Sequence, residues 1–177
     1  MRGRFFALSF FVCLAFVSRA VAQDASTWTR FTSPEGRFSV MMPAEPAREE
    51  QSKLVRGRLV MMRFFTAGVG QGVFIVAYAD YRMGNVKQEL DANRDSFLKG
   101  MQATLISESD IKLRENPGRE IRATRDKVSI RSRIYLVGRR YYQAVAITPA
   151  TLPANLEADR FLNSFELLTT ATPAEKK

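Results

Sequence analysis

Residues 73–81, VFIVAYADY, carry apolar side chains on both sides of the two-residue alternation of a β-strand. A strand with one face in water alternates apolar and polar residues, so this strand is expected to be covered on both faces. We therefore place it at the centre of a sheet. The glycine-rich segment before it, residues 68–72, predicts a hairpin loop. A phosphate-binding loop is disfavoured there, because the segment lacks a Gly-Lys-Ser/Thr ending and precedes a strand.

The neighbouring segments predict further strands and two helices. Apolar residues recur at helical spacing in residues 88–103 and 154–165. Residues 44–52 hold Pro46 and four charged residues and predict a loop. Alternation and turn signals predict strands at residues 28–31, 37–42, 54–65, 105–113, 120–124, 128–137, 141–148 and 166–168.

The order of these elements, strands, helix, strands, helix, predicts an α+β fold. Their hairpin-like connections predict a central, mainly antiparallel β-sheet. Since the central strand is apolar on both sides, we expect helices to flank this sheet on both faces, as in an α/β/α sandwich.

The N-terminal residues predict a secretory signal peptide. Arg2 and Arg4 precede an apolar run at residues 5–17, and Ala20-Val21-Ala22 is a small-x-small cleavage site. The apolar run is shorter than the roughly 20 residues of a membrane span, although an uncleaved anchor is the alternative. We expect export to the periplasm or the exterior, with no transmembrane segment after cleavage. The expected organisation is a signal peptide at residues 1–22, a single domain at 23–168 and a disordered polar tail at 169–177.

The composition excludes several kinds of catalytic site. The 177 residues include no histidine, and the single cysteine, Cys13, leaves with the signal peptide. A His-ligated zinc ion, a Ser-His-Asp triad and a thiolate nucleophile are therefore excluded. Asp91 and Asp95 share a helix face, but their place near the helix start accounts for them. We expect no enzyme, no cofactor and no metal site; a hydrolase built on carboxylates and serine is the catalytic alternative.

The most distinctive feature is the basic segment, residues 119–140, which holds eight basic residues and two acidic ones. Cleavage of the signal peptide lowers the formal charge from +9 to +6, so this segment contains the whole surplus. We expect it to bind an acidic protein or an anionic envelope component; export disfavours nucleic acid. The predicted partner-binding residues are Arg119, Arg122, Arg125, Lys127, Arg131, Arg133, Tyr135, Arg139 and Arg140.

Two other interpretations of the exposed surface stay open. The basic segment is also typical of a solvated sheet edge that charge protects from aggregation. Alternatively, a groove between sheet and helix, lined by Phe64, Phe65, Phe74 and Tyr78, carries a small apolar or amphipathic ligand. The sequence does not indicate the oligomeric state or the identity of a partner.

Six further segments carry recognisable structural motifs: 31–43 (FTSPEGRFSVMMP), 76–81 (VAYADY), 117–120 (PGRE), 133–137 (RIYLV), 141–143 (YYQ) and 160–165 (RFLNSF). Together they resemble the PsbP-like family, which includes the extrinsic subunit of photosystem II and bacterial relatives. The resemblance covers about residues 28–168, and its motifs are structural rather than catalytic. It implies a central antiparallel sheet flanked by helices, and a role as an assembly, accessory or docking protein. The closer likeness is to secreted or periplasmic bacterial members.

Overall fold

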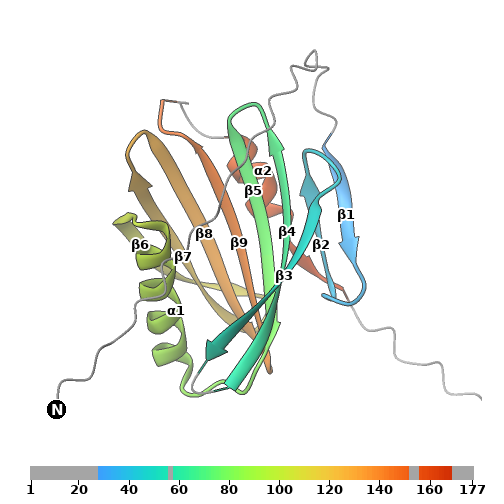
Figure 1. Cartoon of the computed structure of the whole chain (residues 1–177), viewed down its shortest axis with the longest axis vertical. Coiled ribbons are helices and arrows are strands. Elements are labelled where there is room, and N and C mark those ends of the chain that lie inside the picture. Colours follow the sequence, from blue (N-terminus) through green and yellow to red (C-terminus); the bar gives the residue numbers. More distant parts are fainter. Residues whose placement is uncertain (1–27, 56–57, 152–155, 169–177) are drawn as a thin grey trace, which may run out of the picture.

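The computed structural model describes residues 28–55, 58–151 and 156–168. The predicted signal peptide and the predicted polar tail lie outside these residues. The described part of the chain forms ten strands and two helices (Figure 1). In chain order they are β1 (Thr29–Ser33), β2 (Phe38–Met42), β3 (Ala47–Val55), β4 (Arg58–Val69), β5 (Gly72–Asp80), α1 (Val86–Met101), β6 (Thr104–Leu113), β7 (Asn116–Arg125), β8 (Val128–Val137), β9 (Arg140–Pro149), α2 (Leu156–Asn163) and β10 (Glu166–Leu167).

Seven strands form one antiparallel sheet in the order β3-β4-β5-β9-β8-β7-β6, and β1, β2 and β10 form a second, smaller sheet. The strand predicted to be central is β5, which pairs with β4 on one side and β9 on the other. Phe74, Val76 and Tyr78 of β5 are fully buried on one face, and Ala77 and Ala79 are buried on the other. The glycine-rich segment forms the β4–β5 turn, as predicted.

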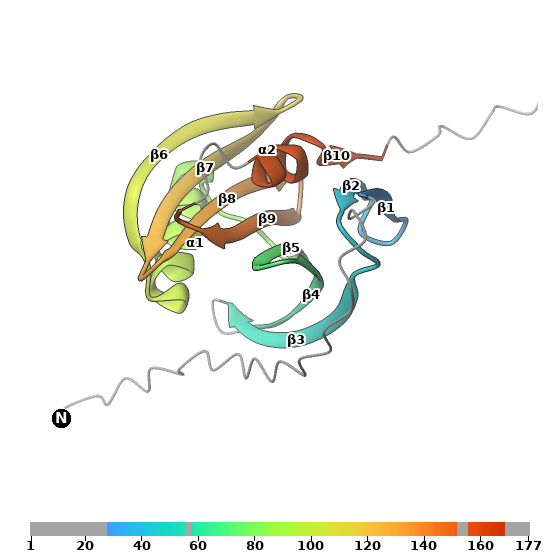
Figure 2. The same cartoon turned by 90° about the horizontal axis from the view of Figure 1, so that it is seen from above.

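The expected α/β/α sandwich is wrong. The protein is mostly antiparallel sheet, and its two described helices are short, with 16 residues in α1 and 8 in α2. Helix α1 lies against one face of the large sheet, whereas the other face is covered by α2 together with the small sheet (Figure 2). An apolar strand must be covered, but a second sheet covers it as well as helices do.

The predicted loop at residues 44–52 is also wrong in its main part, because β3 occupies residues 47–55. This strand pairs with β4 along its whole length. Its side chains are exposed or half-buried throughout, so it lacks the apolar alternation that predicts a strand. It lies at the edge of the large sheet, where charged residues are common because they prevent pairing with other chains.

Aromatic side chains fill the space between the two sheets. Phe38 of β2 is fully buried and contacts the rings of Phe65, Tyr78, Tyr142 and Phe165 at centroid distances of 5.5–6.3 Å. Such a cluster buries a large apolar area and holds the small sheet against the large one.

The closing helix is tied to the small sheet through Ser164. The Ser164 hydroxyl accepts a hydrogen bond from the backbone N–H of Met41 at 2.8 Å and donates one to the carbonyl of Phe161 at 2.7 Å. Phe161 and Phe165, on either side of it in the sequence, are both buried in the aromatic core. The RFLNSF segment is therefore a structural motif.

Candidate anion-binding site

The predicted partner-binding residues do not form one surface. Arg119 of β7 faces α1, and only 8% of its side chain is exposed. Its guanidinium lies 2.6 Å from Asp91 of α1, 3.2 Å from Glu108 of β6 and 3.0 Å from Asp110 of β6. The Lys87 ammonium and the Arg119 guanidinium, which both donate to Asp91, lower the pKa of that carboxyl from 3.8 to about 2. Arg119 therefore links α1 to the sheet and is not available to a partner.

A second ion-pair cluster lies on the opposite face of β7 and β8. Glu120 accepts a hydrogen bond from Arg133 at 2.7 Å and one from Arg122 at 3.1 Å. Burial would raise the pKa of Glu120, but Arg133 and its neighbours outweigh this effect and lower it. Arg133 also donates to the carbonyl of Leu162, and Arg131 pairs with Asp159, so both arginines fasten α2 to the sheet.

Tyr135 is buried as well. Only 4% of the residue is exposed, and its ring stacks on Phe165 with a centroid distance of 5.8 Å. Burial raises the pKa of its hydroxyl. Tyr135 is thus part of the aromatic core rather than of a docking surface.

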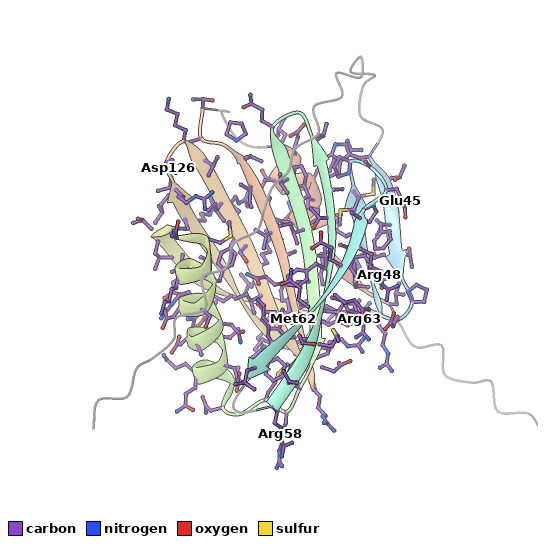
Figure 3. The ribbon with its side chains drawn as sticks, viewed as in Figure 1. Glu45, Arg48, Arg58, Met62, Arg63 and Asp126 are labelled. Atoms are coloured by element: carbon purple, nitrogen blue, oxygen red, sulfur yellow. The ribbon has the colours of Figure 1, made fainter. Side chains whose placement is uncertain are left out.

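The other predicted residues lie at opposite ends of the molecule. Arg125 and Lys127 flank the β7–β8 turn, near the labelled Asp126, whereas Arg139 and Arg140 lie at the β8–β9 turn (Figure 3). The two turns are separated by the ten-residue length of β8. Arg122 is exposed, but it lies within β7 and pairs with Glu120. The basic segment therefore contributes to several separate surfaces.

One of these ends gathers arginines from distant parts of the chain. Because the strands are antiparallel, the β6–β7 and β8–β9 turns, the start of β4 and the end of β5 lie at the end of the large sheet where Figure 3 labels Arg58. The β1–β2 turn of the small sheet lies beside this end, where Arg140 donates a hydrogen bond to the carbonyl of Glu35. We call this end, with its exposed arginines, the basic end. Its residues are Arg37, Arg58, Arg82, Arg114 and Arg139.

A cavity of about 670 Å³ opens at the basic end. Arg58, Arg82 and Arg139 line it, together with the apolar side chains of Val86 and Leu136, and none of its lining residues is acidic. Among the described residues, these three arginines have no ion pair with a carboxylate. They present planar groups of N–H donors, which match the oxygens of carboxylates and phosphates.

A second cavity, of about 630 Å³, shares Arg139 with the first and is also lined by Arg37 and Arg114. Its one acidic lining residue, Asp80, is neutralised by Arg140 of β9, whose Nε lies 2.6 Å from the carboxylate. The hydrogen bond from Arg140 and the charge of Arg37 lower the pKa of Asp80. The two cavities together are lined by both cationic and apolar groups, which makes this surface a candidate site for an anion.

Four of the five arginines of the basic end, Arg37, Arg58, Arg82 and Arg114, were not among the predicted partner-binding residues. Each comes from a different hairpin or loop, so no window of the sequence shows the cluster. Arg37 and Arg114 have φ values of +55°, which places both in the left-handed turn conformation. The cluster can be recognised only once the strand order is known, because the strand order shows that several turns containing arginine lie at the same end of the sheet.

Two further kinds of feature, a metal site and a membrane-spanning helix, were sought among the described residues. No group of three or more His, Cys, Asp or Glu side chains among them is arranged to hold a metal ion. In the same part of the chain, no helix is long and apolar enough to cross a membrane.

Comparisons with known proteins support the fold. No protein-family model matches the chain, and no curated protein matches it. The structure is similar to the solution structure of cyanobacterial PsbP (CyanoP) from Synechocystis sp. PCC 6803, with a TM-score of 0.58. The match covers 85% of this chain and 98% of that chain at 9% sequence identity. The PsbP-like fold suggested by the motifs is therefore supported, and at this identity the similarity concerns the fold alone.

Proposed function

We propose that the protein is a non-enzymatic accessory protein that docks onto an anionic component of the cell envelope through the basic end. The observation that carries this proposal is the convergence of five exposed arginines around two cavities whose one acidic lining residue is already paired with Arg140. Export, which the N-terminal sequence predicts, brings the protein to the envelope.

The contrast with the other arginines supports this proposal. Arg94, Arg119, Arg131 and Arg133 each lie within hydrogen-bonding distance of a carboxylate. The arginines lining the first cavity have no such partner among the described residues, and gathering like charges is unfavourable unless a counter-charge binds. An anionic partner supplies that counter-charge and is attracted over a distance of about 10 Å at moderate salt.

The proposed surface differs from the one expected from the sequence. Of the predicted partner-binding residues, Arg139 belongs to the basic end, and Arg140 lines the second cavity while paired with Asp80. Arg122, Arg125 and Lys127 are exposed elsewhere, so a surface at the β7–β8 turn is the alternative that a test must address.

A second candidate function is the carriage of a small amphipathic anion. The first cavity favours it, because Met83, Val86 and Leu136 lie in the same lining as the arginines. Of the four aromatic residues predicted to line a groove, Phe65, Phe74 and Tyr78 are buried in the core. A carrier would therefore bind a ligand with an acidic head group rather than a purely apolar one.

Charge reversal tests the docking proposal. The processed protein, carrying a tag, is lightly crosslinked in the envelope fraction of its host, and the retained components are identified for the wild type and for Arg82→Glu/Arg139→Glu. We expect the variant to lose the components that the wild type retains, and the wild type to lose them as salt rises. The matched control is Arg125→Glu/Lys127→Glu, which makes the same change of charge at the opposite end.

The control also defines the outcomes that contradict the proposal. Loss of the components with Arg125→Glu/Lys127→Glu but not with Arg82→Glu/Arg139→Glu would assign docking to the β7–β8 turn. If both variants retain the same envelope components as the wild type, docking through charged residues at either end is eliminated. Saturable thermal stabilisation of the wild type by a monomeric amphiphile such as an alkyl phosphate, without any retained macromolecule, would favour the carrier.

A further inference from the structure

Two leucines near the tip of the β3–β4 hairpin are exposed to solvent. Leu54 is 71% exposed and Leu59 is 77% exposed. They are paired directly across the two strands, so their side chains lie next to each other on the same face of the hairpin. Together they form an apolar tip, which has no cover among the described residues of the chain.

On the face of the hairpin that holds the two leucines, the side chains become more exposed with distance from the aromatic core. Along one face of β4, Phe65 is buried in the aromatic core, Arg63 is a quarter exposed, Met61 is 41% exposed and Leu59 is 77% exposed. On this face burial thus falls towards the end of the strand, whereas Val60 on the opposite face is only 7% exposed. The leucine pair is therefore presented to the surroundings on a projection only two strands wide.

The projecting leucines adjoin the basic end. Arg58 precedes Leu59 in β4, so its side chain points to the opposite face of the hairpin, where it lines the first cavity with Arg82 and Arg139. Figure 3 shows Arg58 at the extremity of the molecule. Val86, which is 45% exposed, lines the same cavity. Exposed leucines and arginines thus lie at the same end of the molecule, on opposite faces of the hairpin, and no carboxylate of the described residues is paired with these arginines. This combination is typical of proteins that bind at the interface of anionic bilayers, where apolar side chains enter the head-group region and cations bind lipid phosphates.

We infer that the anionic component bound by the basic end is the surface of a lipid bilayer. Leu54 and Leu59 enter the head-group region, and Arg58, Arg82 and Arg139 bind the phosphates around them. A protein partner would need a pocket shaped to receive the convex tip, whereas a bilayer accepts such a tip without one. This inference rests on the proposed function and names its partner.

Vesicle flotation tests the inference directly. The processed protein, with its intact mass measured so that a retained signal peptide is excluded, is mixed with vesicles of phosphatidylcholine alone or of phosphatidylcholine and phosphatidylglycerol. We expect binding to the anionic vesicles only, and weaker binding at high salt. Leu54→Ser/Leu59→Ser is expected to weaken binding by at least about tenfold, because the inserted apolar groups are lost.

The matched control removes exposed apolar side chains elsewhere. Ile106 of β6 and Leu156 of α2 are 65% and 77% exposed, and neither lines the cavities of the basic end. Ile106→Ser/Leu156→Ser should change vesicle binding by less than about twofold. Equal weakening by both pairs of substitutions would overturn the inference. Since all four side chains are exposed, the thermal midpoints of both variants should match that of the wild type.

A fluorescent variant separates insertion from adsorption by charge alone. Leu59→Trp adds a reporter to a chain whose single native tryptophan, Trp28, is 9% exposed. We expect its emission to shift to the blue and to be quenched by brominated lipid in anionic vesicles. Binding without either change would show adsorption only and overturn the role assigned to the leucines.

The outcomes distinguish this inference from the proposed function. If Arg82→Glu/Arg139→Glu abolishes retention of an envelope protein while the wild type does not bind vesicles, docking stands and the bilayer is eliminated as its partner. If that variant still binds both the envelope and the vesicles like the wild type, the proposed function fails as well.

Discussion

At the scale of single residues, Gly118 explains why the PGRE segment contains glycine. Gly118 of β7 is paired with Tyr135 of β8. A Cβ atom at this position would collide with the carbonyl oxygen of Ile134 and with the ring of Tyr135. The absence of a side chain therefore lets Tyr135 lie across the neighbouring strand and stack on Phe165. A glycine in a strand commonly marks such a close approach.

This packing predicts opposite effects for two glycine substitutions. Gly118→Ala should lower the free energy of unfolding by about 1–3 kcal/mol, because the added methyl group displaces Tyr135. Gly100→Ala, in the last turn of α1 where nothing lies within 4 Å of the new Cβ, should raise it by about 0.5–1 kcal/mol. Urea unfolding of the two variants measures both values. Equal changes in the free energy of unfolding, in the same direction, would show that the contact with Tyr135 does not determine the effect of Gly118→Ala.

At the scale of elements, Arg119 connects three pieces of secondary structure. Its guanidinium contacts carboxylates of α1 and β6, while its backbone belongs to β7. The apolar contacts of α1 with the sheet run beside it, through Leu90, Ile121 and Leu136. The charged contact and the apolar contact therefore fix the same helix on the same face.

Removal of this link should loosen α1 selectively. Arg119→Ala is expected to lower the free energy of unfolding by about 2–3 kcal/mol, since two half-buried carboxylates lose their shared cation but keep some contact with water. Hydrogen exchange should accelerate most in α1. The control is Arg122→Ala, three residues along the same strand and 54% exposed, which should cost less than about 1 kcal/mol. A similar loss in both variants, or no change in α1, would contradict this role of Arg119.

At the scale of the whole molecule, carboxylates held by arginines determine how stability depends on pH. The chain has no histidine, so none of its side chains has an unperturbed pKa between about 5 and 8. The pKa of Asp91 is lowered to about 2, and those of Asp80 and Glu120 are lowered too. Below the ordinary pKa of these groups, the unfolded chain binds more protons than the folded one.

The free energy of unfolding should therefore be nearly constant from about pH 6 to about pH 8 and fall below about pH 4. The contribution of Asp91 is complete above its ordinary pKa of 3.8 and is lost as the pH falls towards about 2. Urea unfolding across this range should show a shallower fall for Asp91→Asn. Asp126→Asn, at a side chain that is 89% exposed, should leave the profile unchanged. Identical profiles for wild type and Asp91→Asn would refute this assignment.

The whole fold also shows which features local sequence determines. Periodicity predicted β5, α1 and the β8–β9 hairpin within a few residues of their observed bounds, because each element carries its own pattern of apolar residues. It failed for β3, whose charged residues suit a sheet edge and carry no alternation. Periodicity also failed to predict the layers that pack on the large sheet. An apolar pattern on both sides of β5 shows that both faces are covered, but it does not distinguish cover by a helix from cover by a second sheet.

The sequence by itself determined the number and sign of the charges and the absence of imidazole chemistry, and it predicted most of the strands. Only the tertiary structure decided which arginines face a carboxylate. Packing of α1 on the sheet brought Arg119 to Asp91, and antiparallel pairing brought Arg133 to Glu120 and Arg140 to Asp80. Folding also brought the arginines of five separate segments to one end. The physical reason is that an ion pair depends on distances of a few ångströms between residues far apart in the chain, and only folding sets those distances.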